Sequence, residues 1–176
     1  SRAQTVRITG GMHLSVALAM GAALPETRLG DIEVIDPRGN VWSSSPSAES
    51  SGHKTTVESI DATAPADLSG RQRVAALVTL TPNPDLAAFR RMVGGAPGGF
   101  RVAVRIAVQP ETTLEPNAAA RISAEVASHL KRISAEGDRA EVHLAFQGPY
   151  GIAVLVGRLL NTLRVVAYEW EDQHPL

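Results

Sequence analysis

Few side chains in this sequence have the types and spacing that catalysis requires. Ser15 lies close to His13, but it lacks the G-x-S-x-G setting of a nucleophilic serine, and no orienting acid can be assigned. The five histidines are scattered. Only Glu125 and His129 have the spacing that shares a helix face, and one such pair is more typical of a solvated surface than of a metal site. We therefore expect neither catalysis nor a bound metal.

Composition excludes further classes of site. The chain contains no cysteine, which removes thiolate catalysis and Cys-ligated zinc or iron–sulfur centres. Its 17 lysines and arginines balance 18 acids, so no overall positive field favours long nucleic acids, although a small anion needs only local charges. No apolar run is long enough to span a membrane, and the start has no signal-peptide pattern. We expect a cytoplasmic protein without membrane contact.

Two glycine-containing loops offer better-defined ligand chemistry. Gly10 and Gly11 end the β-branched run "TVRIT", while Gly148 and Pro149 end the run "EVHLAF". A segment of helical composition follows each loop. The start of a helix presents free N–H groups and the positive end of its dipole, which accept anions. Two such loops suit a ligand with two or more phosphates.

We predict that loop residues at the ends of strands contact this ligand. They are Thr9, Gly10, Gly11, His13, Ser15, Thr81, Gln147, Gly148, Pro149 and Tyr150. The ring of Tyr150 would stack on a base. Two further candidates are Trp42 for base stacking and Lys54 for pairing with a phosphate. Core packing is an equal alternative for Trp42, and a solvated charge is the alternative for Lys54.

A dinucleotide cofactor is a competing interpretation of the first loop. Gly10 and Gly11 follow a strand, and Asp36 ends a later one, as an acid contacting a ribose would. However, "TGGMHLSVALAMG" does not match G-x-G-x-x-G, and "DPRG" suits a turn between antiparallel strands. We therefore expect no cofactor.

The elements that must position these loops alternate between strands and helices. Strands are predicted at 5–9, 55–60, 74–80, 100–108, 141–146 and near the C-terminus, helices at 12–24, after 81, at 117–133 and after 149, and a β-hairpin insertion at 31–45. The continuously apolar run at 74–80 is typical of a central strand, and 55–60 is expected at an edge. This order indicates an α/β fold with a largely parallel sheet.

Three polar residues lie on predicted strands. Arg101 and Arg105 share one strand face, where a helix-covered core would make them costly, so we interpret this strand as an exposed edge. Contacts with acids or with ligand are the alternatives. His143 lies on the polar phase of "EVHLAF" and is predicted to be a half-buried histidine with satisfied hydrogen bonds.

The first and last units resemble each other at a shift of 136 positions. Ala17 then falls on Ala153, Gly21 on Gly157, and Leu24 on Leu160. In each unit the alanine and glycine are four residues apart, so they lie on one helix face and would allow close packing on the sheet. The pattern predicts two Rossmann-like halves whose strand carboxyl ends face a shared crevice.

Three stretches resemble the SAVED domain, the sensor module of bacterial CBASS antiviral effectors. They are "VRITGGMHLSVALAMGAAL", "VAALVTLTP" and "VHLAFQGPYGIAVLVGRLLNTLRVVAYEW". The resemblance implies one sensor domain over 1–176 with two fused CARF-like halves. These halves are expected at 1–73 plus the following strand region and at 100–176. The fused effector is expected to be absent from this chain.

The same resemblance implies a function. The domain would bind a cyclic di- or trinucleotide second messenger, such as cGAMP, form head-to-tail homo-oligomers, and activate a fused effector such as an HNH nuclease in antiphage defence. The sensor itself would not be an enzyme. One alternative is a Rossmann-like enzyme acting on a nucleotide, such as a ring nuclease, and another is a purely structural interaction module.

Overall fold

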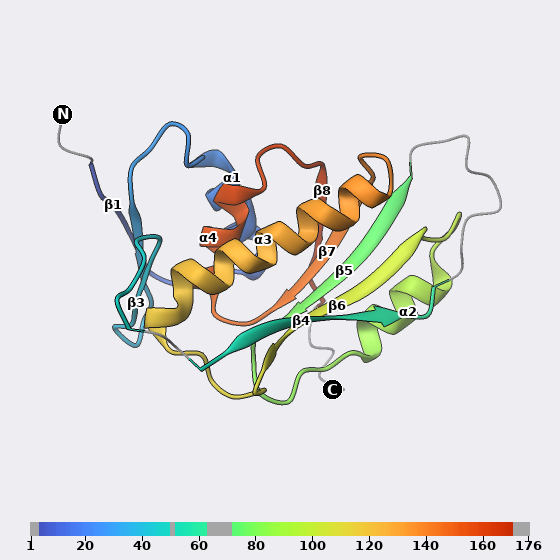
Figure 1. Ribbon diagram of the computed structural model, residues 1–176, viewed down its shortest axis with the longest axis horizontal. Helices are drawn as coiled ribbons and strands as arrows, with labels where there is room; N and C mark the ends of the chain where they lie inside the picture. Colours follow the sequence, from blue (N-terminus) through green and yellow to red (C-terminus); the bar gives the residue numbers. More distant parts are fainter. Residues whose placement is uncertain (1–3, 50–51, 63–71, 171–176) are drawn as a thin grey trace, which may run out of the picture.

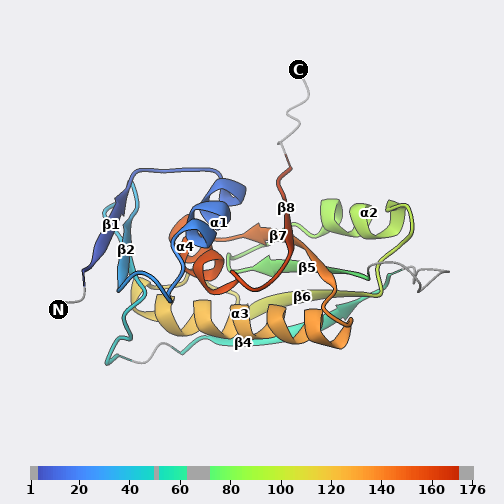
Figure 2. The same ribbon diagram turned by 90° about the horizontal axis from the view of Figure 1, so that it is seen from above.

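The computed structural model describes residues 4–49, 52–62 and 72–170. Over these ranges the chain forms a mixed α/β fold with two β-sheets and four α-helices (Figure 1). The helices are α1 (Leu14–Ala23), α2 (Ala87–Gly95), α3 (Ala119–Glu136) and α4 (Tyr150–Leu159), with a 3-10 turn, η1 (Pro116–Ala118), before α3. Figure 2 shows α1 and α4 between the smaller sheet and the larger one.

The smaller sheet contains β1 (Val6–Thr9), β2 (Ile32–Ile35) and β3 (Val41–Ser43) in that order. β1 and β2 are parallel and are joined through α1, whereas β2 and β3 are antiparallel. The Gly39 N–H donates to the Asp36 carbonyl at 2.9 Å, and the Asp36 N–H donates to the Asn40 carbonyl at 3.0 Å. The predicted hairpin is therefore confirmed, with "DPRG" as its turn.

The larger sheet has the order β4-β6-β5-β7-β8. Its strands are β4 (Lys54–Ile60), β5 (Arg73–Thr79), β6 (Val102–Gln109), β7 (Glu141–Gln147) and β8 (Val165–Tyr168). Three pairings are parallel, and β4 is antiparallel to β6 at one edge. The predicted central strand and the predicted edge strand are both confirmed, as β5 and β4.

Helices cover both faces of the larger sheet. Because side chains alternate along a strand, Leu77 of β5 packs with Phe89 of α2, whereas Ala76 packs in the core that contains Ile122 of α3. Figure 2 shows α2 and α3 on opposite faces of this sheet. Burial on both faces explains why β5 is apolar along nearly its whole length.

Helices α1 and α4 pack on each other through glycines. A Cβ added to Gly21 would lie 2.0 Å from the Val154 carbonyl oxygen, and one added to Gly157 would lie 2.2 Å from that of Leu18. These two contacts show that the helices run in opposite directions. The prediction that these glycines allow close packing on the sheet was wrong, because the partner is the other helix.

The repeat of 136 positions is visible in the helix bounds. Leu14 and Ala23, the ends of α1, map onto Tyr150 and Leu159, the ends of α4. Each helix follows one strand and leads to a second strand parallel to the first. The two close contacts also exchange under the shift, since Leu18 maps onto Val154. The first and last β–α–β units are thus arranged about an approximate two-fold relation between α1 and α4.

Candidate functional site at the carboxyl ends of the strands

The two predicted ligand loops meet at Tyr150. Its hydroxyl donates to the carbonyl of Gly10, just after β1, and lies 3.1 Å from the carbonyl of Ile35, at the end of β2. Gly10 has φ +115°, a conformation that favours glycine. Burial, and then the nearby Asp36 carboxylate, raises the pKa of the Tyr150 phenol, so the hydroxyl remains a donor at neutral pH. Residues far apart in the sequence therefore form one surface.

The two helix starts do not converge on one point. Since α1 and α4 are antiparallel, their N-termini lie at opposite ends of a helix pair about 15 Å long. The Tyr150 hydroxyl contacts Gly10, and the chain then runs through His13 to the start of α1. Figure 2 shows this connection between β1 and α1. The arrangement gives two separate anion-accepting positions joined by a loop.

A carboxylate of the chain itself already occupies the first position. Glu169 accepts hydrogen bonds from the Leu14 N–H at 3.1 Å and from the Ser15 hydroxyl at 2.7 Å. His13 Nδ1 lies 3.4 Å from the same carboxylate. Sequence reasoning missed Glu169, since nothing local to "YEW" shows that it ends beside α1. His13 and Ser15 are therefore brought together by an internal anion.

The second position, at the start of α4, has no such partner. Pro149 is the N-cap residue, with φ −62° and ψ 130°, and its side chain cannot cap. Among residues 4–49, 52–62 and 72–170, no side chain accepts a hydrogen bond from the first N–H groups of this helix. The Ile152 N–H donates to the Pro149 carbonyl at 3.1 Å and Gly151 is buried, so among the described residues the N–H of half-buried Tyr150 is the best placed for an external anion.

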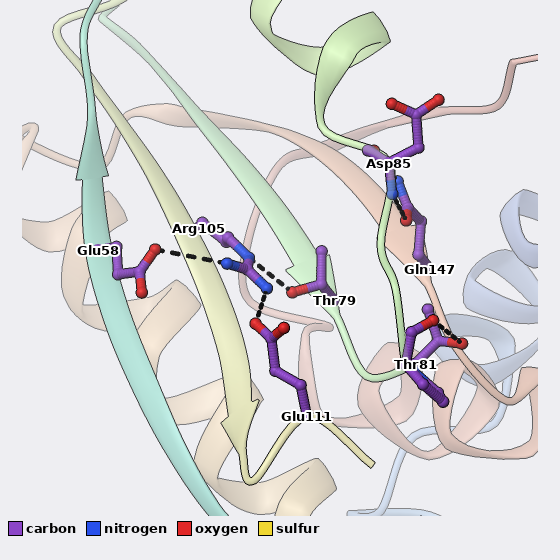
Figure 3. A network of polar contacts seen from close by, with 8 residues as sticks. Glu58, Thr79, Thr81, Asp85, Arg105, Glu111 and Gln147 are labelled. Atoms are coloured by element: carbon purple, nitrogen blue, oxygen red, sulfur yellow. Dashed lines mark hydrogen bonds and ion pairs between the residues drawn. The ribbon is translucent and has the colours of Figure 1, made fainter. Parts of the chain in front are cut away.

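Thr81 and Gln147 lie near one another at the carboxyl edge of β5 and β7. The chain leaves β5 toward β6 on one side and returns to β7 on the other, so this edge is the point where the connections diverge. The Gln147 side chain bonds the Asp85 backbone, with its Oε1 3.0 Å from the Asp85 nitrogen (Figure 3). A Cβ on Gly148 would lie 2.9 Å from Leu80 Cβ. Gln147 and Gly148 thus set the shape of this edge.

A buried arginine lies beside this edge. Arg105 is 9% exposed and donates from Nε to the Thr79 hydroxyl at 2.9 Å. Its other nitrogens contact Glu111 and, at 3.5 Å, Glu58 (Figure 3). The prediction of an edge strand here was wrong, because β6 lies between β4 and β5. The alternative of acidic partners is confirmed for Arg105, whereas Arg101 precedes β6 and is exposed.

The structure places Trp42 and Lys54 away from these loops' exposed surface. Trp42 is 4% exposed, its Nε1 donates to Asp36 at 3.0 Å, and a Cβ on Gly151 would lie 2.5 Å from its ring. This is core packing and leaves no ring face for a base. Lys54 is exposed at the start of edge strand β4, and β6 separates β4 from β5 and β7.

Asp36 serves the hairpin turn. Burial would raise the pKa of its carboxyl, but hydrogen bonds from the side chains of Asn40 and Trp42 and from the N–H groups of Asn40 and Arg38 outweigh this and lower the pKa. Since these four donors engage both carboxylate oxygens, the turn interpretation of "DPRG" holds. Neither carboxylate oxygen of Asp36 is left to accept a hydrogen bond from a cofactor ribose.

Two histidines singled out from the sequence have satisfied ring nitrogens. His143 is buried between Tyr168, 2.7 Å from Nδ1, and Glu141, 2.8 Å from Nε2, as predicted for a structural histidine. His129 and Glu125 both contact the Thr55 hydroxyl at 3.0 Å.

Within the described ranges, no group of three or more His, Asp or Glu side chains is placed to hold a metal ion. In that same part of the chain, no helix has the length and hydropathy to cross a membrane.

Solved structures with a similar fold come from bacterial receptors. The fold matches the Acinetobacter baumannii Cap4 SAVED/CARF-domain containing receptor with the cyclic trinucleotide 2'3'3'-cAAA at a TM-score of 0.72 and 14% identity, covering 96% of this chain and 35% of that one. The same receptor with 3'3'3'-cAAA matches at 0.68 and 18% identity, covering 96% and 36%. The Moraxella osloensis Cap4 receptor matches at 0.65 and 17% identity, covering 97% and 35%.

The chain spans about a third of the length of these receptors. No curated protein sequence matches it. A family model does match, over residues 1–175, and it describes the "SMODS-associated and fused to various effectors sensor domain". A match over nearly every residue places this chain in the SAVED family.

Proposed function

We propose that the domain senses a cyclic oligonucleotide, with a cyclic trinucleotide as the first candidate, on the surface formed by Gly10–Ser15 and Gln147–Tyr150. The observation that carries the proposal is the pair of helix starts joined by Gly10–His13. The start of α4 offers unpartnered N–H groups, and the start of α1 binds a carboxylate that a phosphate can replace. Cyclic oligonucleotides carry several phosphates and suit such spaced positions.

Membership of a sensor family supports this function. The similarity to receptors solved with cyclic trinucleotides supports the ligand class, although these chains share only the fold at 14% and 18% identity. The 136-residue repeat supports two CARF-like Rossmann halves within one domain. In the full protein, ligand binding would favour head-to-tail homo-oligomers and activate a fused effector such as a nuclease, because a ligand that bridges protomers stabilises the assembled state.

Substitutions at Pro149 test the start of α4. Asp and Asn are nearly the same size and both cap helices, but only Asp adds a negative charge beside the N–H groups. We expect Pro149→Asn to bind 3'3'3'-cAAA in calorimetric titration and Pro149→Asp to bind at least about tenfold more weakly. Both variants should melt at similar temperatures. Equal affinities would remove the start of α4 from the binding surface.

A second experiment separates sensing from cleavage. Ser15, His13 and Glu169 lie together at the start of α1, but in the described part of the chain the Ser15 hydroxyl donates to Glu169 and no hydrogen bond joins it to His13, so the serine has no general base. Incubation with each cyclic trinucleotide, followed by mass spectrometry, should return the ring intact. Linear products that disappear with Tyr150→Phe or Ser15→Ala would support a ring nuclease instead of a sensor.

A further inference from the structure

A second candidate site lies away from the ligand loops. A pocket of about 670 Å³ opens between the beginning of α3, the second half of α4, the loop after β3 and the loop before β2. None of the residues predicted to contact the cyclic oligonucleotide lines it. Its volume lies in the range of small-molecule sites, roughly 300 to 1,000 Å³.

Three buried polar atoms of this pocket lack hydrogen-bond partners. They are Nε of Arg158, Oγ of Ser123 and Oδ1 of Asn117. Arg158 is 3% exposed and Ser123 is 2% exposed, so neither residue has more than marginal access to bulk water. Buried polar groups are normally paired, and each orphan costs free energy. Three such atoms on residues that line one pocket point to a ligand with both acceptor and donor groups.

Arg158 is held in place without an acidic partner. Its Nη2 donates to the Leu29 carbonyl at 3.2 Å and to the Gly30 carbonyl at 2.9 Å, which leaves Nε for another acceptor. Within the described ranges, no carboxylate lies within ion-pair distance of this guanidinium. A buried arginine stays charged, so an anionic group beside it would be strongly favoured.

Asn117 lacks a hydrogen-bond donor, whereas Arg158 lacks an acceptor. Its Nδ2 donates to Glu49 at 3.2 Å, which fixes the amide orientation, because a carboxylate only accepts. The free Oδ1 therefore needs a donor. Glu26, Asp31 and Glu49 line the pocket together with Arg121, which forms an ion pair with Glu125 at 3.0 Å. The three acids favour a ligand with a cationic donor and disfavour a polyphosphate.

We propose that this pocket binds a small zwitterion of the amino-acid class. Its carboxylate would accept from Nε of Arg158 and from the Ser123 hydroxyl. Its ammonium group would donate to Oδ1 of Asn117 and face the acids that line the pocket. The site is independent of the cyclic oligonucleotide, and neither proposal requires the other.

The wild-type protein can test this proposal directly. The proteinogenic L-amino acids would be added one at a time, and the NMR resonance of the Arg158 Nε–H would be followed. The matching amino-acid amides, which lack the carboxylate, and the matching N-acetyl derivatives, which lack the ammonium charge, serve as controls. We expect at least one amino acid to shift this resonance with saturation, while both of its derivatives fail.

Two serines of α3 provide matched variants. Ser123 has no partner, whereas Ser134 is equally buried and donates to the Ala140 carbonyl at 2.7 Å. Ser123→Ala should leave folding unchanged and weaken the amino acid about tenfold, because a hydrogen bond to a charged group is lost. Ser134→Ala should lower the melting temperature and leave the affinity unchanged.

Three results would overturn the proposal. One is that no amino acid shifts the Arg158 resonance, which would mean that the pocket holds only water. The second is equal binding of the amide or acetyl derivative. The third is an affinity that Ser123→Ala does not change. Loss of cyclic-oligonucleotide binding would not bear on this pocket, and the two proposals therefore fail separately.

Discussion

The first β–α–β unit and the last one have similar backbones and different surroundings. Position 7 of the first unit maps onto position 143 of the last by the 136-residue shift. Arg7 is exposed and pairs with Glu33, whereas His143 is buried between Glu141 and Tyr168. β1 alternates in burial, while the middle of β7 is buried on both faces. The covering elements, and not the unit itself, decide which residue chemistry each position carries.

The two helix starts differ in the same way. The start of α1 is closed by the carboxylate of Glu169. In contrast, α4 begins at Tyr150, whose hydroxyl bonds carbonyls of the first unit. An internal repeat thus yields one anion position occupied by the protein and one left open. This asymmetry is what a ligand-binding test must examine.

The largest expected loss of stability is at the glycine contacts between α1 and α4. Gly21→Val and Gly157→Val each place a Cβ within about 2 Å of a backbone carbonyl oxygen, so each should cost more than ~3 kcal/mol of unfolding free energy. Gly94→Ala on α2 is the control, since no atom lies within 4 Å of its added Cβ. It should stabilise slightly. Urea unfolding measures both losses, and a loss below ~1 kcal/mol at either glycine would contradict the close contact of α1 with α4.

The next effect concerns the bridge between the loops. Tyr150→Phe removes the hydroxyl that bonds the Gly10 and Ile35 carbonyls, and it should cost about 1 to 2 kcal/mol of stability. Affinity for 3'3'3'-cAAA should also fall, because Gly10–His13 loses its tie to α4. Tyr168→Phe removes a hydroxyl on β8 and should leave affinity unchanged. Equal losses of affinity in both variants would show a general effect of stability.

A smaller effect is expected at the closed helix start. Glu169 has a side chain that is 36% exposed, so Glu169→Gln should cost less than ~1 kcal/mol of stability. Its effect on ligand affinity should be the opposite, an increase, because a phosphate no longer competes with a carboxylate at α1. Glu33→Gln on β2 is the control for net charge, because Glu33 pairs with Arg7 of β1, whereas Glu169 bonds the start of α1. Unchanged affinity would exclude α1 from the ligand surface.

The smallest effect is the pH dependence of the buried histidine. Burial lowers the pKa of His143, against the raising effect of Glu141, and burial likewise lowers that of His129. Because the unfolded chain then binds more protons, stability should be complete above the ordinary histidine value of ~6.5 and should fall as pH drops below it. His143→Gln should flatten this slope in part, since His129 remains. A stability that rises on acidification would contradict the assignment.

Local patterns predicted most of the elements. The apolar run of β5, the turn residues of the hairpin, and the small residues of α1 and α4 each act over a few positions, where backbone and packing preferences are strong. The repeat also gave the correct correspondence of the two helices. Their mutual packing was not predictable, because a glycine face fits either a sheet or another helix.

Contacts between distant segments escaped prediction. Arg105 seemed costly in an interior strand until Glu58 and Glu111 supplied its acids, and Trp42 was undecided until Gly151 proved to lie against its ring. Glu169 and Arg158 drew no attention, although an arginine within the apolar run of "YGIAVLVGRL" was a usable signal. Each of these depends on which strand ends beside which helix, and sequence periodicity does not carry that information.

One ligand is expected to span the open start of α4 and the start of α1 that Glu169 closes. Titration of isotope-labelled protein with 3'3'3'-cAAA, followed through backbone amide shifts, tests it most directly. We expect saturable shifts that are largest at Tyr150 and Gly151 of α4 and at Leu14 and Ser15 of α1, with little change in α2. No saturable shifts, or shifts confined to residues outside Gly10–Ser15 and Gln147–Ile152, would contradict it.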